Sequence, residues 1–281
     1  MMKIRHILVG TDFSEGSQRA FARALALSRD CQAGVTLFHA VKSDLILAIR
    51  ERLVAYGGEV LREWIASLPD TDRTGITGQI EAGDPLTMIL SQADEADLIV
   101  VGASSKKGLK EFFVGTTTER LVRHSERPVL VVKQPVKGPY RRVLVAVDFS
   151  EGASRALEAA YQMAPGADFL LVHAWQVTPV GFGSLEMAQK KMDAQNELLR
   201  KRLERQAQDH LLKLGSSAAV PRIEMRAGNP VTVLREALQS YSPDLLAMGS
   251  HARSGMAIAM LGSMAREFLV EAPCDVLVTR V

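Results

Sequence analysis

The chain has few cysteines, no long apolar run and almost no net charge, and each shortage excludes a class of protein. Its 281 residues hold two cysteines, Cys31 and Cys274, with no CxxC pair or cysteine–histidine cluster, which argues against a disulfide framework or structural zinc. No stretch approaches the roughly 18 consecutive apolar residues of a membrane helix. The net charge of +2 gives no electrostatic reason to expect nucleic acid or a membrane surface as a partner.

The composition is that of a folded protein from a reducing compartment. The hydrophobic fraction is 47% and the charged fraction 23%, so the chain has enough apolar residues to form a core without disulfide bonds or structural metal ions. The opening segment MMKIRHILVGTDFSE has an apolar run that is too short for a signal-peptide core. We therefore expect a cytoplasmic protein.

The chain repeats itself. The string DFSEG occurs at residues 12–16 and again at 148–152. Four further pairs follow in the same order: TLFHA (36–40) and LLVHA (170–174), EAGDP (81–85) and RAGNP (226–230), ADLIVVGAS (96–104) and PDLLAMGSH (243–251), RPVLVV (127–132) and CDVLVT (274–279). Such long, ordered matches indicate a duplicated domain rather than a short-period solenoid. The prolines and glycine of QPVKGPYR break the pattern, so we expect domains at 1–134 and 141–281.

Both halves show the same alternation of strands and helices. Each opens with an apolar run, IRHILVG or RRVLVAV, that is typical of a strand buried on both faces. A helix follows, which in the first half is capped by Ser14 and turns Ala20, Phe21, Ala24 and Leu25 toward the core. This order predicts an α/β fold, with a doubly wound, mainly parallel five-stranded sheet in each of two tandem domains.

The remaining elements extend this prediction. A second strand ends at His39 or His173, and long helices are expected over 45–67 and 185–214. Right-handed crossovers place the loops after the first and fourth strands on one carboxyl edge, where open α/β sheets bind ligands.

The loop after the fourth strand is the most informative motif. Glycine ends the strand in both halves, at Gly102 and Gly249. Gly115-Thr116 and Gly262-Ser263 then open a helix. Glycines allow backbone N–H groups to approach an anion, and the helix N-terminus and nearby hydroxyls add further donors. The spacing therefore predicts a phosphate cradle.

These motifs resemble the universal stress protein family over the whole chain. Its nucleotide-binding members carry G-x2-G-x9-G-[ST] in this loop, an Asp after the first strand and a small residue after the second-strand His. The resemblance implies a Rossmann-like fold of the adenine nucleotide alpha hydrolase type, binding ATP or a related adenine nucleotide with Mg²⁺ on the phosphates. The implied first-half site residues are Gly10, Thr11, Asp12 and Ala40 for adenine and ribose, and Gly102, Ser105, Gly115, Thr116 and Thr117 for the phosphates. The implied second set is Asp148, Ala174, Gly249, His251, Ala252, Gly262, Ser263 and Met264.

Both halves depart from the family pattern at its second glycine. Ser105 stands there in the first half and Ala252 in the second. Either side chain weakens binding if close phosphate approach needs glycine, but serine returns a hydroxyl donor. Lys106 and Lys107 also favour the first half, which we therefore rank as the stronger nucleotide site.

Structural interpretations of the same residues stay open. Asp12 and Asp148 suit a turn or a helix cap as well as a ribose contact. His39 and His173, at strand ends, are more typical of structural histidines than of bases.

Three functions are compatible with the sequence. The first is a regulatory stress-response protein that binds an adenine nucleotide. The second, motivated by Ser105 and Ala252, is a stress protein that has lost the nucleotide and acts through contacts with a protein partner. The third is a slow ATP hydrolase, but a dedicated enzyme is not expected, because no paired carboxylates lie beside the glycine loop and the sequence has no P-loop.

The last strand of each half is apolar and would leave a free sheet edge that needs a partner. The resemblance implies that the two last strands pair across a pseudo-twofold axis, so that one chain mimics a dimer of single-domain proteins. A further homodimer of two chains stays open.

Overall fold

The computed structural model describes residues 3–105, 112–113, 116–175, 185–214, 220–250 and 261–280. The first half contains β1 (His6–Gly10), α1 (Glu15–Cys31), β2 (Gly34–Val41), α2 (Leu47–Ala66), α3 (Asp70–Arg73), β3 (Ile76–Ala82), α4 (Pro85–Gln92), β4 (Leu98–Gly102), β5 (Ser104–Ser105), β6 (Phe112–Phe113), α5 (Thr116–His124) and β7 (Val129–Val132). The second half contains β8 (Arg142–Ala146), α6 (Glu151–Met163), β9 (Asp168–Trp175), α7 (Leu185–Leu214), β10 (Arg222–Ala227), α8 (Pro230–Tyr241), β11 (Leu245–Gly249), α9 (Ser263–Glu271) and β12 (Asp275–Thr279).

One ten-stranded sheet runs through both halves, in the order β10-β9-β8-β11-β12-β7-β4-β1-β2-β3. Each half contributes five parallel strands, which confirms the predicted fold class. The halves join where β7 and β12 pair antiparallel, with Leu130 opposite Leu277. The two apolar last strands therefore cover each other's edges, as predicted for an internal pseudo-dimer.

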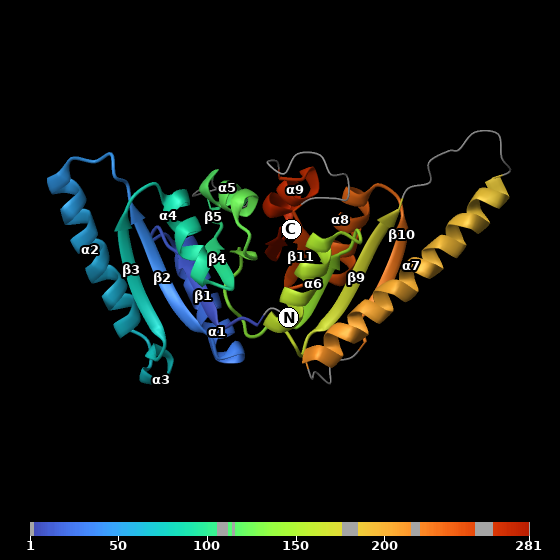
Figure 1. The fold of residues 1–281 in the computed structure, drawn as a ribbon, viewed down its shortest axis with the longest axis horizontal. Coiled ribbons are helices and arrows are strands. Elements are labelled where there is room, and N and C mark those ends of the chain that lie inside the picture. The colour runs from blue at the N-terminus through green and yellow to red at the C-terminus, as the bar shows by residue number, and fades with distance from the viewer. Residues whose placement is uncertain are drawn as a thin grey trace.

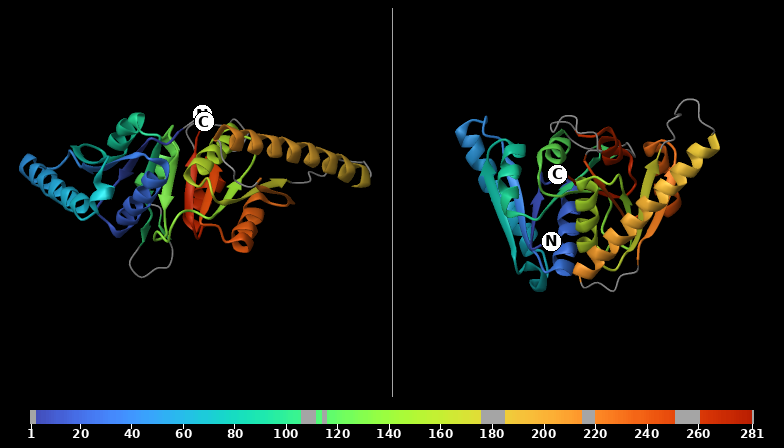
Figure 2. Two further views of the ribbon diagram at one scale, coloured as in Figure 1. Left: turned by 90° about the horizontal axis from the view of Figure 1, so that it is seen from below. Right: turned by 45° about the vertical axis from the view of Figure 1, so that its right-hand side comes forward.

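Helices cover both faces of this sheet. One apolar cluster packs α1, α2, α6 and α7 against one face, and a second packs α4, α5, α8 and α9 against the other. The carboxyl ends of β3 and β9 point to the same, upper side of Figure 1, where α5 and α9 lie together near the centre. The helix α7 projects past β10 at one end of the sheet (Figure 2).

Local structure follows the sequence closely. Ser14 caps α1 by accepting a hydrogen bond from the N–H of Ser17, as predicted. The four residues expected to face the core are buried: Ala20, Phe21, Ala24 and Leu25. The second strands, however, continue past the two histidines to Val41 and Trp175, because their parallel partners β3 and β10 extend equally far.

The junction between the halves encloses a buried polar cluster around Asp275. Its Oδ1 accepts hydrogen bonds from the backbone N–H groups of Lys133 at 2.8 Å and Gln134 at 3.1 Å. Its Oδ2 accepts a 2.6 Å bond from the Tyr140 hydroxyl and lies 3.4 Å from Nε of Arg23. The carboxylate is 1% exposed, so these partners replace the water it loses on folding.

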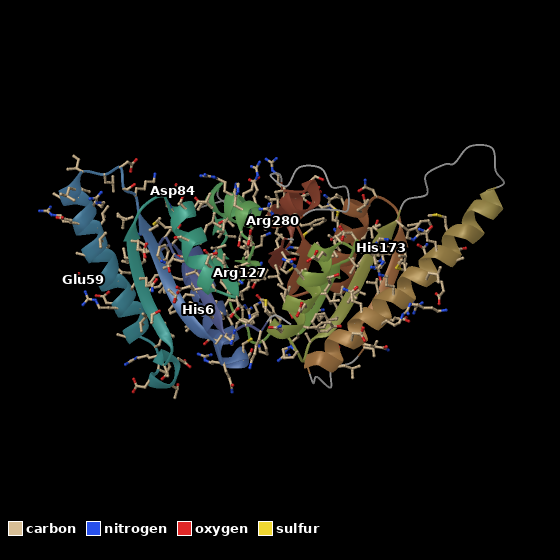
Figure 3. All side chains as sticks on the ribbon, viewed as in Figure 1. His6, Glu59, Asp84, Arg127, His173 and Arg280 are labelled. Atoms are coloured by element: carbon tan, nitrogen blue, oxygen red, sulfur yellow. The ribbon has the colours of Figure 1, made fainter. Side chains whose placement is uncertain are left out.

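Two basic residues also tie each half to the last helix of the other. Nζ of Lys133 donates to the carbonyl oxygens of Val270 and Ala272, at the end of α9. Nη1 of Arg280, labelled near the centre of Figure 3, donates to the carbonyl oxygen of Arg123 at the end of α5. Cations are favourable there because carbonyl groups at a helix C-terminus lack internal partners.

Candidate functional site

A tight turn follows the first strand of each half and sets the two aspartates. Oδ1 of Asp12 accepts a hydrogen bond from the N–H of Ser14 at 3.0 Å, and Oδ1 of Asp148 accepts one from Ser150 at 2.9 Å. The residues between, Phe13 and Phe149, have φ of 62° and 63°, a left-handed conformation that is rare for a bulky residue. Backbone strain of this kind gathers at functional sites, and here it is present twice.

The two histidines hold the same turns from the neighbouring strand. Nδ1 of His39 lies 2.7 Å from the carbonyl oxygen of Thr11, and Nδ1 of His173 lies 2.6 Å from that of Val147. A carbonyl can only accept, so Nδ1 carries the proton in both rings. The His39 ring also contacts Phe13 at 4.3 Å between centroids. Both histidines therefore have the structural role predicted, and Figure 3 shows His173 on β9.

The first-half turn carries an extra hydroxyl network. The Thr11 hydroxyl accepts from the N–H of Phe13 at 3.0 Å and donates to Oγ of Ser17 at 3.0 Å. Burial raises the pKa of Asp12, but hydrogen bonds from Ser14 and Ser17 outweigh it and hold the pKa below its usual value. Valine and alanine replace Thr11 and Ser17 in the second half, at 147 and 153, so that turn lacks this network.

The strand-end glycines of the loop motif have a packing role. A methyl group at Gly102 would overlap the carbonyl group of Gly16, at the start of α1. A methyl at Gly249 would lie 2.9 Å from the backbone nitrogen of Ala153 in α6. These glycines let the first helix of each half approach the fourth strand, which brings the helix start and the aspartate turn to the sheet edge.

A cavity of about 380 Å³ opens at this edge in the second half. Its walls are mainly apolar, with Val172, Val233, Leu234 and Met248 among them. Polar residues line it as well: Asp148, Ser250 and Ser263, together with the glycines Gly249 and Gly262. Its volume lies within the range of small-molecule sites, and apolar walls with a few polar groups are typical of them.

The start of α9 faces this cavity without a side-chain cap. Its N-cap is Gly262, and no side chain bonds the first turn within the part of the chain that the structure describes. The helices α6 and α8, by contrast, are capped by Ser150 and Asn229. Because the first N–H groups of a helix need acceptors and carry partial positive charge, this end of the cavity can accept an anion.

Comparison with known proteins identifies the family. The model of the universal stress protein family matches the chain twice, at residues 3–133 and 139–280. The chain belongs to the universal stress protein family. A universal stress protein of Methanocaldococcus jannaschii is 28% identical over 144 residues, covering 47% of this chain and 84% of that protein. Such a relative corresponds in length to one half of the tandem.

Solved structures share the fold over the whole chain. A universal stress protein from Archaeoglobus fulgidus superposes with a TM-score of 0.70 at 20% identity, covering 98% of both chains. A protein of unknown function from Pseudomonas aeruginosa gives a TM-score of 0.65 at 18% identity, covering 99% of this chain and 93% of the other. At these identities the likeness establishes the shared architecture alone.

The structure gathers most of the second-half residues implied by the family pattern. The following line the cavity together: Asp148, Ala174, Gly249, Gly262, Ser263 and Met264. His251 and Ala252 lie outside the described residues.

The first-half residues take the equivalent places in their own domain. Gly10, Ala40 and Gly102 lie toward the carboxyl ends of β1, β2 and β4, while Thr11 and Asp12 form the turn after β1. Ser105 is in β5, and Thr116 and Thr117 begin α5. Gly115, Lys106 and Lys107 lie outside the described residues.

Sequence reasoning missed the apolar wall of the cavity. Val172, Val233, Leu234 and Met248 read as ordinary core residues, because an apolar side chain in a strand or helix gives no sign of whether it faces protein or ligand. The repeated Gly-x-Pro turn before α8 was the one available signal, since Pro230 lies beside these residues in the cavity lining.

Proposed function

We propose that this protein binds ATP or a related adenine nucleotide in the cavity of its second half, as a regulatory stress-response protein. The observation that carries the proposal is the position of Asp148 and the uncapped start of α9 around one apolar cavity. A nucleotide has the matching parts: a flat apolar base, a ribose with hydroxyl donors, and an anionic phosphate chain.

Each part of the nucleotide has a suitable partner. Val172, Val233 and Met248 offer apolar surface to the base. Oδ1 of Asp148 is used by Ser150, but its other oxygen has no hydrogen bond among the described residues and can accept from the ribose. The N–H of Gly262 already donates to the carbonyl oxygen of Ser250, so Ser263 presents the first open backbone N–H group, together with its hydroxyl, to phosphate at the helix start.

The donor set bears on Mg²⁺ as well. No group of three or more His, Cys, Asp or Glu side chains in the described parts of the chain is placed to hold a metal ion. Among the described residues that line the cavity, Asp148 is the one carboxylate. This fits a magnesium ion that enters with the nucleotide and is held chiefly by phosphate oxygens and water, as Mg²⁺ commonly is.

Side-chain sizes at equivalent positions favour the second half as the nucleotide site. The sequence motifs alone had ranked the first half higher. Phe38 stands where β9 has Val172, and Met88 where α8 has Val233. In the first half, these larger side chains occupy the positions whose second-half equivalents line the cavity. A methyl at Gly10, equivalent to Ala146, would already lie 3.2 Å from both Ile89 and Val101.

A second candidate function is contact with a protein partner. On α2 and its cap, Ile46, Ile49, Leu53 and Tyr56 are between 42% and 73% exposed. Their spacing places them along one side of the helix. Exposed apolar stripes of this kind often mark interaction sites. This activity does not depend on a nucleotide.

The experiment is isothermal titration calorimetry of the full chain with ATP and Mg²⁺. We expect one nucleotide per chain, and ADP release measured on the same samples should show slow hydrolysis at most. Val172→Phe, which introduces the first-half residue into the second-half wall, should abolish binding. The matched control, Phe38→Val, should retain it.

Other outcomes would contradict the proposal. Binding that survives Val172→Phe in a folded variant would locate the nucleotide elsewhere, with the first half as the next candidate. No binding of ATP, ADP or AMP to the wild-type protein would favour a function through protein contacts.

A further inference from the structure

A second and larger cavity lies at the junction of the two halves. Its volume is about 630 Å³, and its lining combines the connecting segment 134–142 with residues 238–239, 242–244 and 273–275 and one residue of α1, Arg23. The second-half strands β8, β11 and β12 begin here, whereas the candidate nucleotide cavity lies where second-half strands end. The two cavities share no lining residue.

Positive charge dominates the lining of this junction cavity. Four basic side chains, Arg23, Lys137, Arg141 and Arg142, face two carboxylates, Asp244 and Asp275. Both carboxylates are already engaged by the protein. Oδ2 of Asp244 accepts the backbone N–H groups of Arg141 at 2.9 Å and Arg142 at 3.0 Å. Asp275 accepts hydrogen bonds from the backbone N–H groups of Lys133 and Gln134 and from the Tyr140 hydroxyl.

Arg23 forms the inner wall and has donor capacity to spare. It is 5% exposed, and Nη1 donates to the carbonyl oxygen of Gly138 at 2.8 Å. Its guanidinium lies over the Tyr140 ring at 4.0 Å. Nε lies 3.4 Å from Asp275 but makes no hydrogen bond, although it is buried. Nε therefore faces the Asp275 carboxylate, while Nη2 has no hydrogen bond among the described residues and is the donor left for a ligand.

The outer cations are unpaired. Lys137 and Arg141 are exposed, and neither side chain has a hydrogen bond or ion pair within the part of the chain that the structure describes. Arg142 donates from Nη1 to the carbonyl oxygen of Tyr241 at 3.1 Å. Within the described residues, the cavity lining thus combines a buried guanidinium, Arg23, with two exposed and unpaired cations, Lys137 and Arg141.

We propose that the junction cavity binds a small phosphate-bearing molecule. Guanidinium groups match phosphate oxygens with paired hydrogen bonds, and a lysine ammonium adds a point charge. The volume fits a small organic phosphate. Because Arg23 belongs to α1 and Lys137 and Arg141 to the connecting segment, the bound anion ties the first half to the start of the second.

The experiment is calorimetric titration of the full chain with inorganic pyrophosphate at constant ionic strength. We expect saturable binding that Lys137→Ala/Arg141→Ala weakens at least about tenfold, through the loss of charge-assisted hydrogen bonds. The matched control is Arg52→Ala/Arg62→Ala, two exposed arginines of α2, and it should bind as the wild type does. Because all four side chains are exposed, the variants should fold, which circular dichroism checks.

A further variant separates this site from the nucleotide cavity. Val172→Phe should leave pyrophosphate binding intact even if it abolishes ATP binding, so either proposal can fail without the other. The junction site is disproved by an absence of saturable binding, by equal affinity in Lys137→Ala/Arg141→Ala, by an equal loss in the α2 control, or by loss in Val172→Phe. Tighter binding of citrate than of pyrophosphate would overturn the assignment to phosphate.

Discussion

Glu119 and Arg266 occupy equivalent positions in the two halves, and their side chains form an ion pair at 3.4 Å across the junction. Each is the fourth residue after the loop glycine that precedes its helix, Gly115 or Gly262. Two identical first halves related by the same axis would instead bring Glu119 toward Glu119. The duplicated helices have therefore diverged in charge so that each suits the other half of the same chain.

Charge reversal tests this pairing. Arg266→Glu should lower the free energy of unfolding by up to about 1 kcal/mol, since an exposed ion pair contributes little and is replaced by repulsion. The exchange Glu119→Arg/Arg266→Glu should restore most of the loss. Urea unfolding at low salt measures both, and the differences should shrink at about 1 M salt, where the screening length is about 3 Å. A double variant no more stable than Arg266→Glu would contradict the pairing.

Alanine at the strand-end glycines tests the close approach of helix and sheet. Gly102→Ala should cost about 1–3 kcal/mol or more, because the methyl overlaps the Gly16 carbonyl. Gly249→Ala should also destabilise the protein, but by less, since its nearest contact is 2.9 Å.

Gly58→Ala is the matched control for these variants. A methyl there meets nothing within 4 Å, so the change in helix α2 should stabilise by about 0.5–1 kcal/mol. Thermal unfolding gives the order of the three variants. Equal stability of Gly102→Ala and Gly58→Ala would disprove the packing role.

Lys133 should give the protein a distinct alkaline pH dependence. Burial lowers the pKa of its ammonium to about 8 from 10.5, although the nearby Asp275 and Glu271 act in the opposite direction. Between these two values the unfolded chain keeps the proton that the folded protein has released. The contribution of Lys133 to stability therefore rises with pH across that window.

Comparison with Lys133→Met isolates this effect. Burial raises the pKa of Cys274 from the ordinary thiol value of 9.0 to about 12, so that thiol acts in the opposite direction as pH rises above 9.0. Unfolding free energies from about pH 7 to about pH 10 should show the wild type gaining on the variant. A difference that stays constant with pH would rule out a perturbed Lys133.

Repeated motifs were sufficient to predict the architecture. The DFSEG strings and the paired apolar strands predicted two parallel five-stranded sheets, because the alternation of strands and helices is a local property. Ser14 as the cap of α1 was predictable for the same reason. The second strands were predicted to end too early, at His39 and His173, because strand length depends on the partner strand, which lies far away in sequence.

The candidate site was only partly predictable. The sequence pointed to Asp148, Gly249, Gly262 and Ser263, and the structure places them around one cavity. The sequence ranked the first half as the stronger nucleotide site because of loop residues such as Ser105. The difference in size between Phe38 and Val172 gave no signal in the sequence, because only the tertiary structure shows that Val172 lines a cavity.

The sequence by itself determined the family, the duplication and the order of elements, because each is written in short-range patterns and their repetition. The tertiary structure alone decided that an apolar cavity opens beside Asp148 in the second half, and where the unpaired cations of the described residues gather. The cavity and the cation cluster each depend on residues that are far apart in sequence, because a cavity is the space that several packed elements leave unfilled. Arg23, for example, meets Asp275 and lines the junction cavity only because β7 and β12 join the two sheets.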